Sequence, residues 1–450
     1  MKKIESVHIA RYGASTADVR SQLGHCDGEC VLLVTDDDSD SRPENESAIL
    51  AMQQEAASTG AGIVYSDLFR ETDGSRLLHP LCDWQAGSLR DDFDFGTMLV
   101  LSGDALRWYL SQDLQEFRFA GFYQLWLSVS EKFAIHHISR ALYTATESDT
   151  RQSGQKQFDY VNPRNRDVQI EMEAACTEHL KRIGGLCDTS ACRDAFGDIG
   201  RQDISASVII PVRDRERTIR DAVLSALSQK TDFPFNVIVV DNHSTDSTTG
   251  IMTGLAAADS RVVHIIPERN DLGIGGCWDL AVRDPRCGLF AVQLDSDDLY
   301  SSPGTLQTIV DKFLAERCAM VIGSYRMCDF HLETLPPGII DHREWTDLNG
   351  PNNALRINGL GAPRAFYTPV IREIGFPNVS YGEDYAVGLA ISGIYRIGRI
   401  YDELYLCRRW EGNSDTALSP EKICRNNSYK DSVRTAELLR RQKRNSETGR

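Results

Sequence analysis

The 450-residue sequence lacks any apolar run long enough to cross a membrane, and it lacks an excess of positive charge. Two lysines near the N-terminus are not followed by the apolar core of a signal peptide. The formal net charge of −16 argues against sequence-independent binding to nucleic acid, which depends on neutralising phosphates. We therefore expect a cytoplasmic protein without nucleic-acid partners and with at most peripheral membrane contact.

The cysteines lack the spacing of a metal site or of a disulfide framework. The tightest pairs among the twelve cysteines are Cys26/Cys30 and Cys187/Cys192, and neither has a second pair at zinc-site spacing. We expect reduced thiols, as is usual in cytosolic proteins. A hydrophobic content of 41% and a charged content of 25% are ordinary for a globular chain, and its length allows two or three domains.

Three carboxylates follow directly on an apolar run at residues 290–298, Phe-Ala-Val-Gln-Leu-Asp-Ser-Asp-Asp. The run is typical of a strand buried on both faces in a parallel sheet, and ligands bind at the strand ends of such sheets. Clustered carboxylates need positive charge beside them, and a divalent cation holding a diphosphate supplies it. The alternative is an acidic turn after a strand.

Strands and helices alternate upstream of this cluster. The pattern predicts strands at 207–212, 236–240 and 262–266, with helices at 218–230 and 277–282. Such alternation predicts right-handed crossovers and a parallel α/β sheet. The glycines at 273–276 allow tight turns and close approach of a ligand.

Five sequence blocks occur here in a recognisable order: SVIIPVRDR, VIVVDNHSTDST, ERNDLGIGGCWDLA, LDSDD and YGEDYAVGLA. With them, residues 205–415 resemble family 2 glycosyltransferases of the GT-A fold, which are inverting enzymes that use nucleotide-diphosphate sugars. The resemblance implies a Rossmann-like mixed sheet, mostly parallel, and binding of Mn²⁺ or Mg²⁺.

The resemblance also assigns residues. Asp297 and Asp298 would hold the metal, and Asp384 would be the general base, with Glu383 beside it. An acidic pair at a helix N-terminus is the alternative reading of these two residues. Donor-nucleotide contacts would come from Pro211, Val212, Arg213, Asp241, Asn270, Gly275, Asp295 and Ser296.

Further candidates lie on the acceptor side and near the diphosphate. Arg364 follows a glycine-rich stretch and would contact acceptor or phosphate, although a solvated surface arginine fits equally well. Arg408 or Arg409 would neutralise the diphosphate. Trp410 stands roughly where many relatives carry a metal-binding histidine; it would stack on a sugar or lie in the core.

The first 150 residues echo the downstream half of this region. Residues 30–38 mirror 290–298, and residues 121–127 lie where 382–385 lie in the second copy. Only about thirty residues precede the first acidic cluster, Asp36–Asp38, so the nucleotide-binding half is missing. That cluster would be a solvated turn or a cation site. Phe122 or Gln124 stands at the place of the base, and neither can accept a proton at neutral pH.

These observations divide the chain into a truncated, inactive GT-A-like α/β domain (1–150), a helical linker (151–203), a catalytic GT-A domain (204–418) and a helical basic tail (419–450). The tail ends in the basic cluster 440–444, which would touch anionic lipid or form a solvated terminus.

The predicted function is metal-dependent inverting transfer of a hexosyl or N-acetylhexosaminyl group in polysaccharide biosynthesis. The donor would be a UDP-sugar, and the acceptor a saccharide or lipid-linked saccharide met at the inner face of the cell membrane. Two alternatives stay open. The first is a nucleotidyltransferase, which would usually carry glycine in the loop 211–217, where this chain has none. The second is a non-catalytic binding protein, in which both domains would have lost catalytic activity. The sequence does not predict the oligomeric state.

Overall fold

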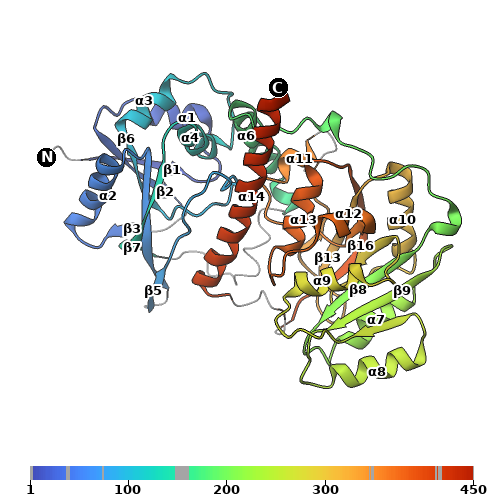
Figure 1. The fold of residues 1–450 in the computed structure, drawn as a ribbon. Coiled ribbons are helices and arrows are strands. Elements are labelled where there is room, and N and C mark those ends of the chain that lie inside the picture. The colour runs from blue at the N-terminus through green and yellow to red at the C-terminus, as the bar shows by residue number, and fades with distance from the viewer. Residues whose placement is uncertain are drawn as a thin grey trace.

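The chain forms two α/β units with a long helix between them (Figure 1). We call them the N-terminal unit, built on strands β1–β7, and the C-terminal unit, built on β8–β16. The computed structural model describes residues 4–36, 41–72, 75–146, 162–343, 345, 349–410, 413 and 418–448.

The C-terminal unit is a nine-stranded mixed sheet covered by helices. Its strands run in the order β10 (Val262–Ile265), β9 (Phe235–Asp241), β8 (Ala206–Val212), β11 (Phe290–Gln293), β15 (Arg364–Tyr367), β13 (Met320–Cys328), β16 (Ile397–Arg408) and β12 (Leu299–Tyr300), and β14 (Thr334–Ile340) pairs with β13. Its helices are α7 (Ile219–Leu227), α8 (Thr248–Ala258), α9 (Ile274–Arg283), α10 (Thr305–Glu316), α11 (Gly350–Asn353), α12 (Thr368–Ile374) and α13 (Glu383–Ser392).

The first four strands of this order are parallel, as the alternating pattern predicted. Every residue of β11 is buried, which explains why it reads as an unbroken apolar run. The predicted strands and helices from 207 to 298 lie within a few residues of their observed bounds. β15 then pairs antiparallel with both β11 and β13, so the sheet is mixed. The fold-class prediction is confirmed.

The N-terminal unit is a seven-stranded sheet in the order β1 (Glu5–Ala10), β2 (Cys30–Asp36), β6 (Met98–Ser102), β4 (Ile63–Thr72), β7 (Ile135–Thr146) and β3 (Ser41–Pro43), with β5 (Ser75–His79) paired to β4. Its helices are α1 (Thr16–Leu23), α2 (Glu46–Thr59), α3 (Gly103–Ser111) and α4 (Gly121–Ser130). Asp37 and Asp38 of the first acidic cluster lie outside the described residues.

The two sheets repeat one arrangement. The series β1-β2-β6-β4-β7-β3 corresponds to β8-β11-β15-β13-β16-β12, and each neighbouring pair has the same direction in both series. The hairpin β4–β5 likewise corresponds to β13–β14. The N-terminal unit has no counterpart, among its described residues, to β9 and β10 with α7 and α8. Those elements form the half of the sheet that the resemblance assigns to the nucleotide.

Helices α4 and α13 fix the residue-by-residue correspondence, because each is ten residues long and each anchors a tyrosine. The Tyr123 hydroxyl donates to the Leu89 carbonyl, and the Tyr385 hydroxyl donates to the Ala354 carbonyl. Matching the two tyrosines places Phe122 where the C-terminal unit has Asp384. Of the two residues predicted at this place, Phe122 therefore takes it and Gln124 does not.

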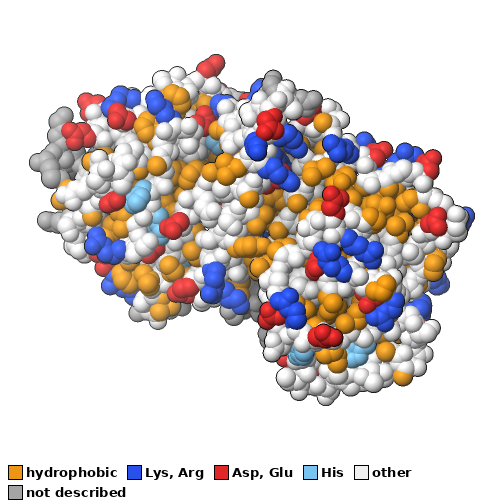
Figure 2. All heavy atoms as spheres, in the orientation of Figure 1, with side chains coloured by type: hydrophobic (Ala, Val, Ile, Leu, Met, Phe, Trp, Pro, Cys, Tyr) orange, Lys and Arg blue, Asp and Glu red, His pale blue; other side chains and the backbone are white. Residues whose placement is uncertain are grey.

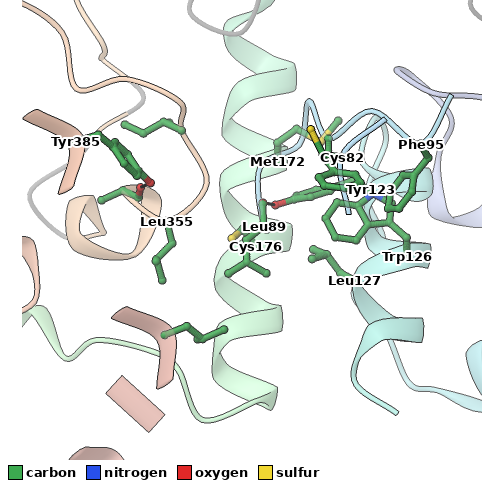
Figure 3. Close-up of a cluster of buried hydrophobic side chains, with 14 of the residues drawn as sticks. Cys82, Leu89, Phe95, Tyr123, Trp126, Leu127, Met172, Cys176, Leu355 and Tyr385 are labelled. Carbon is green, nitrogen blue, oxygen red and sulfur yellow. Dashed lines mark hydrogen bonds between the residues drawn. The ribbon is translucent and has the colours of Figure 1, made fainter. Parts of the chain in front are cut away.

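Helix α6 (Arg166–Arg182) joins the cores of the two units (Figure 3). Met172 and Cys176 of α6 are almost fully buried, with Tyr123 on one side and Tyr385 on the other. Short 3₁₀ turns flank the helix on either side, at Pro163–Asn165, Thr189–Ala191 and Arg201–Asp203. One continuous cluster of buried side chains runs through both units, so they form a joined body.

Helix α14 (Pro420–Thr448) overturns the expectation of a solvated terminus. It lies between the two units (Figure 1) and buries a row of mostly charged side chains. No described helix, α14 included, has an apolar stretch sufficient to cross a membrane. Blue and red side chains are interspersed over the face in Figure 2, so the net negative charge does not gather there as one acidic patch.

Candidate active site

Two adjoining cavities lie where β8 and β11 end. The first has a volume of about 280 Å³ and the second of about 530 Å³, and they share Pro211, Arg215, Ile274 and Ser296. The first is rich in carboxylates and is lined, among others, by Asp295, Asp297, Asp298, Arg364, Glu383, Asp384 and Arg409. The second is lined, among others, by Val212, Arg213, Asn242, Lys422, Arg425 and Tyr429. We call the first the acidic cavity and the second the basic cavity, since no carboxylate lines the second.

The acidic cluster after β11 is held from several directions. Both Asp295 oxygens accept from the Gln293 amide, at 2.9 and 3.0 Å. Asp298 is 5% exposed and accepts from the Arg408 backbone N–H at 2.7 Å. Burial, followed by the charge of Asp297, raises the pKa of Asp298 well above its usual range. Three carboxylates packed this closely repel one another, so a bound cation would stabilise them.

Asp297 is the carboxylate best placed to meet a cation from the cavity. Its Oδ2 accepts from the Trp410 indole Nε1 at 3.1 Å and from the Asn413 amide at 3.2 Å. Trp410 thus neither replaces the histidine as a ligand nor lies in the core; it orients the predicted ligand instead, as groups behind metal-binding carboxylates do. Its ring packs edge-on against Phe330 at 5.4 Å between centroids.

The donor set fits a divalent cation shared with a diphosphate. Among the described residues, no three acidic, histidine or cysteine side chains make a complete metal site on their own. Magnesium-like ions in nucleotide sites take one or two protein carboxylates and complete their shell with phosphate oxygens and water. Asp297, with Asp298 behind it, would supply that number of protein ligands.

Asp384 faces the same cavity from the first turn of α13. Arg364 Nη1 lies 3.0 Å from Asp384 Oδ2 and also donates to the Gly361 carbonyl at 2.6 Å. Burial opposes ionisation of Asp384, but the charges of Arg364 and then of Lys430 outweigh it, so its pKa lies below the usual value. Asp384 is therefore a carboxylate at neutral pH and is able to accept a proton.

Glu383, its neighbour, behaves in the opposite way. Burial and then the charge of Asp384 raise the pKa of Glu383 to about 8. At pH 7 the pair therefore holds one proton, mostly on Glu383. Environments that separate the pKa values of two neighbouring carboxyl groups in this way are typical of acid–base sites.

Replacing Glu383 with glutamine should remove a pH-dependent contribution to stability. Because burial raises the pKa of Glu383 from about 4.3 in the unfolded chain to about 8, the protonated side chain makes its full contribution to stability below pH 4, where folded and unfolded chains both hold the proton. That contribution is lost as the pH rises to 8. We expect Glu383→Gln to lose less thermal stability than the wild type between pH 5 and pH 8, measured by scanning calorimetry. Equal losses would contradict the raised pKa.

Several predicted residues do not converge on the cavities. Asp241 is fully buried and accepts from the Ser244 N–H of the following loop and from the Thr249 hydroxyl of α8. The Arg408 side chain is 3% exposed, and its guanidinium contacts Asp221 rather than either cavity. Neither Asn270 nor Gly275 lines either cavity. A Cβ on Gly275 would lie 2.0 Å from the Pro377 carbonyl oxygen, so this glycine serves helix packing.

The structure also adds residues that the motifs did not identify. Arg215 lies at the boundary of the two cavities, with Nε 4.0 Å from Asp297 Oδ2. Its place in the arginine-rich segment after β8 was the one available signal. Lys422, Arg425 and Tyr429 come from α14, more than thirty residues beyond the last motif, and no pattern pointed to them.

Comparison with known proteins gives one family match, which lies within the C-terminal unit. Residues 207–367 match the family model Glycosyl transferase family 2, which confirms the resemblance drawn from the motifs. No curated protein matches the chain.

Solved structures that match part of the chain include S. aureus TarS 1–349 in complex with UDP-GlcNAc. It is 21% identical, with a TM-score of 0.41, over 53% of this chain and 72% of that one. A second is the mannosyltransferase PcManGT from Pyrobaculum calidifontis in complex with GDP-Man and Mn²⁺. It is 16% identical, with a TM-score of 0.36, over 60% of this chain and 81% of that one.

Proposed function

We propose that this chain, which carries a family 2 glycosyltransferase domain, transfers a sugar from a nucleotide-diphosphate donor to a hydroxyl group with inversion at the anomeric carbon. The observation that carries the proposal is the acidic cavity itself. It brings a cluster of buried carboxylates and the ionised Asp384 to one space of about 280 Å³. The first group suits a metal-bound diphosphate, and the second suits an acceptor hydroxyl.

In the proposed reaction, the acceptor oxygen attacks the anomeric carbon as its proton passes to an oxygen of Asp384. The bond between the anomeric carbon and the diphosphate oxygen breaks, and the nucleoside diphosphate leaves with the bonding electrons. A Mn²⁺ or Mg²⁺ ion on Asp297, with Asp298 behind it, would stabilise the negative charge of the leaving group. Arg364 holds Asp384 in place, and Arg409 faces the same cavity.

We propose a UDP-linked hexose or N-acetylhexosamine as the donor, and a saccharide or lipid-linked saccharide as the acceptor. The nucleoside would lie along Pro211, Val212 and Arg213 in the basic cavity, next to the shared Ser296. The N-terminal unit would be catalytically silent. Phe122 takes the place of the base there, and counting along the paired strands puts Thr35 at the place of Asp295.

Thermal stabilisation by nucleotides tests this function without knowledge of the acceptor. UDP, GDP and dTDP are each added with and without Mn²⁺, and the unfolding temperature is measured. One nucleotide, expected to be UDP, should stabilise the protein in a Mn²⁺-dependent way. At about one hundred times its dissociation constant, the gain in unfolding free energy should be roughly 2.7 kcal/mol. If none of the three stabilises the protein, the transferase proposal fails, and the alternative of a non-catalytic protein takes its place.

A further inference from the structure

Helix α14 brings a buried lysine, from outside the matched residues 207–367, against the segments that carry Arg364 and Asp384. Lys430 is 7% exposed, and its ammonium group donates to the Asn358 carbonyl at 2.6 Å. A Cβ on Gly382 would lie 3.2 Å from its Cγ and 3.3 Å from its Cε, so the lysine stem packs against the residue that precedes Glu383. The ammonium also lies over the Tyr381 ring, 4.3 Å from its centroid.

These contacts tie together two segments of the site. Asn358 belongs to the loop that leads into β15 and Arg364, whereas Gly382 and Tyr381 lead into α13 and Asp384. Arg434, one turn further along α14, donates to the Ile357 carbonyl at 2.8 Å and so holds the same loop. The relative position of Arg364 and Asp384 thus depends on α14.

The other side of α14 is fastened to the N-terminal unit. Asp431, next to Lys430, is fully buried and accepts from Ser88 Oγ at 3.0 Å, while Arg90 Nε lies 3.5 Å from its other oxygen. The Gly87 N–H donates to Thr435 Oγ1 at 2.9 Å. A Cβ on Gly87 would lie 2.1 Å from the Thr435 backbone nitrogen, which leaves room for glycine alone.

We propose that Lys430 is a positioning residue for Asp384, and that the N-terminal unit serves the reaction by holding α14 so that Lys430 stays in place. The inference rests on the proposed function. It gives the N-terminal unit a role that needs no catalysis of its own. The loop 85–90 holds Asp431 of α14, and the neighbouring Lys430 then acts on Asp384.

The charges around Asp384 come from four elements. Arg364 on β15 and Lys430 on α14 favour its ionised form, whereas Glu383 on α13 and Asp295 after β11 face the same group as acids. Removing Lys430 leaves Arg364 as the one cation among these four. The protonated form of Asp384 then becomes more stable relative to the ionised form, so its pKa rises and a higher pH is needed to ionise the base.

The test compares Lys430→Met with Lys430→Arg and with Lys443→Met, an exposed lysine on the same helix. The readout is release of UDP from UDP-glucose or UDP-N-acetylglucosamine with water as acceptor, followed from pH 5 to pH 9. We expect Lys430→Met to lower turnover about tenfold or more and to move the acid limb of the profile up by about one pH unit. Lys430→Arg should keep the acid limb, and Lys443→Met should match the wild type. An unmoved acid limb in Lys430→Met would sink the positioning role.

The second variant, Gly87→Ala, lies in the N-terminal unit and tests the route through α14. It should lower turnover and move the acid limb in the same direction, whereas Gly254→Ala, which has open space around it, should not. The double variant with Lys430→Met should be no slower than Lys430→Met alone, because both act through one group. Multiplying losses would overturn the proposal. UDP with Mn²⁺ should still stabilise each variant; if it fails to stabilise the wild type, the proposed function has failed instead.

Discussion

Asp384→Asn should lower the rate of sugar transfer by about 10²- to 10⁴-fold, the usual contribution of a general base. Asparagine has nearly the same shape and can accept a hydrogen bond from Arg364, but it cannot take the acceptor proton. The proposed nucleotide contacts come from the ends of β8 and β11 rather than from α13, so donor binding should persist. The measurements are UDP release from a UDP-sugar and thermal stabilisation by UDP with Mn²⁺.

A suitable control is Asp271→Asn, since Asp271 is also paired with an arginine, Arg269, but at an exposed site outside the cavities. This variant should turn over at the wild-type rate. If Asp384→Asn kept full turnover, Asp384 would be a structural acid at a helix N-terminus, and the base would have to be sought elsewhere. If it lost nucleotide stabilisation as well, its role would lie in folding rather than in proton transfer.

Asp297→Ala should abolish the Mn²⁺-dependent part of nucleotide stabilisation. This carboxylate lines the cavity, and hydrogen bonds from two side chains, Trp410 and Asn413, fix its orientation. Without it a bound ion would have only the more deeply buried Asp298, whose oxygen already accepts from the Arg408 backbone. At about one hundred times the dissociation constant, the lost stabilisation would be roughly 2.7 kcal/mol.

The same substitution should leave the metal-free protein as stable as the wild type or more so. Asp297 raises the pKa of both Asp295 and Asp298 through repulsion, after burial as the larger cause, and its removal relieves that repulsion. Unfolding temperatures in EDTA measure this directly. A Mn²⁺-dependent shift that survives in Asp297→Ala would contradict the metal assignment, and a large loss of stability in EDTA would show that the carboxylate is structural.

The strands and motif positions could be predicted from the sequence because they depend on local patterns. The buried strand β11 shows its position as an apolar run, and the carboxylates that follow it must lie at the sheet edge. The acidic pair at 383–384 begins a helix, as its sequence indicated, and it also faces the cavity. The helix start is thus confirmed, and the catalytic role of the pair stays a prediction.

Contacts made over long distances in the chain could not be predicted. Lys430 lies 46 positions beyond Asp384, on a helix whose buried face consists largely of charged residues rather than an apolar stripe. Such a face gives no hydrophobic periodicity, so the sequence suggested a solvated terminus. Arg408 and Arg409 are adjacent in sequence, and only the alternation of β16 decides that the first points behind the acidic loop.

The echo between the two halves was visible in sequence as matching segments, but its register was not. The sequence leaves both Phe122 and Gln124 as candidates for the place of the base. The structure decides between them, because the Tyr123 hydroxyl donates to the Leu89 carbonyl as the Tyr385 hydroxyl donates to the Ala354 carbonyl. A buried tyrosine that needs one acceptor fixes a helix more firmly than apolar residues, which tolerate small shifts.

The position of α14 has a consequence for how the protein is made. Both loops that it joins, 85–90 and 357–358, leave the ribosome before residues 420–448 do. Each unit can begin to fold during synthesis, since domains generally form as they emerge. Gly87, Ser88 and Arg90 nevertheless wait for partners that are translated more than 300 residues later. The contacts of α14 with both units can therefore form only after residues 420–448 have been made, whereas α6, which joins the two cores, is translated much earlier.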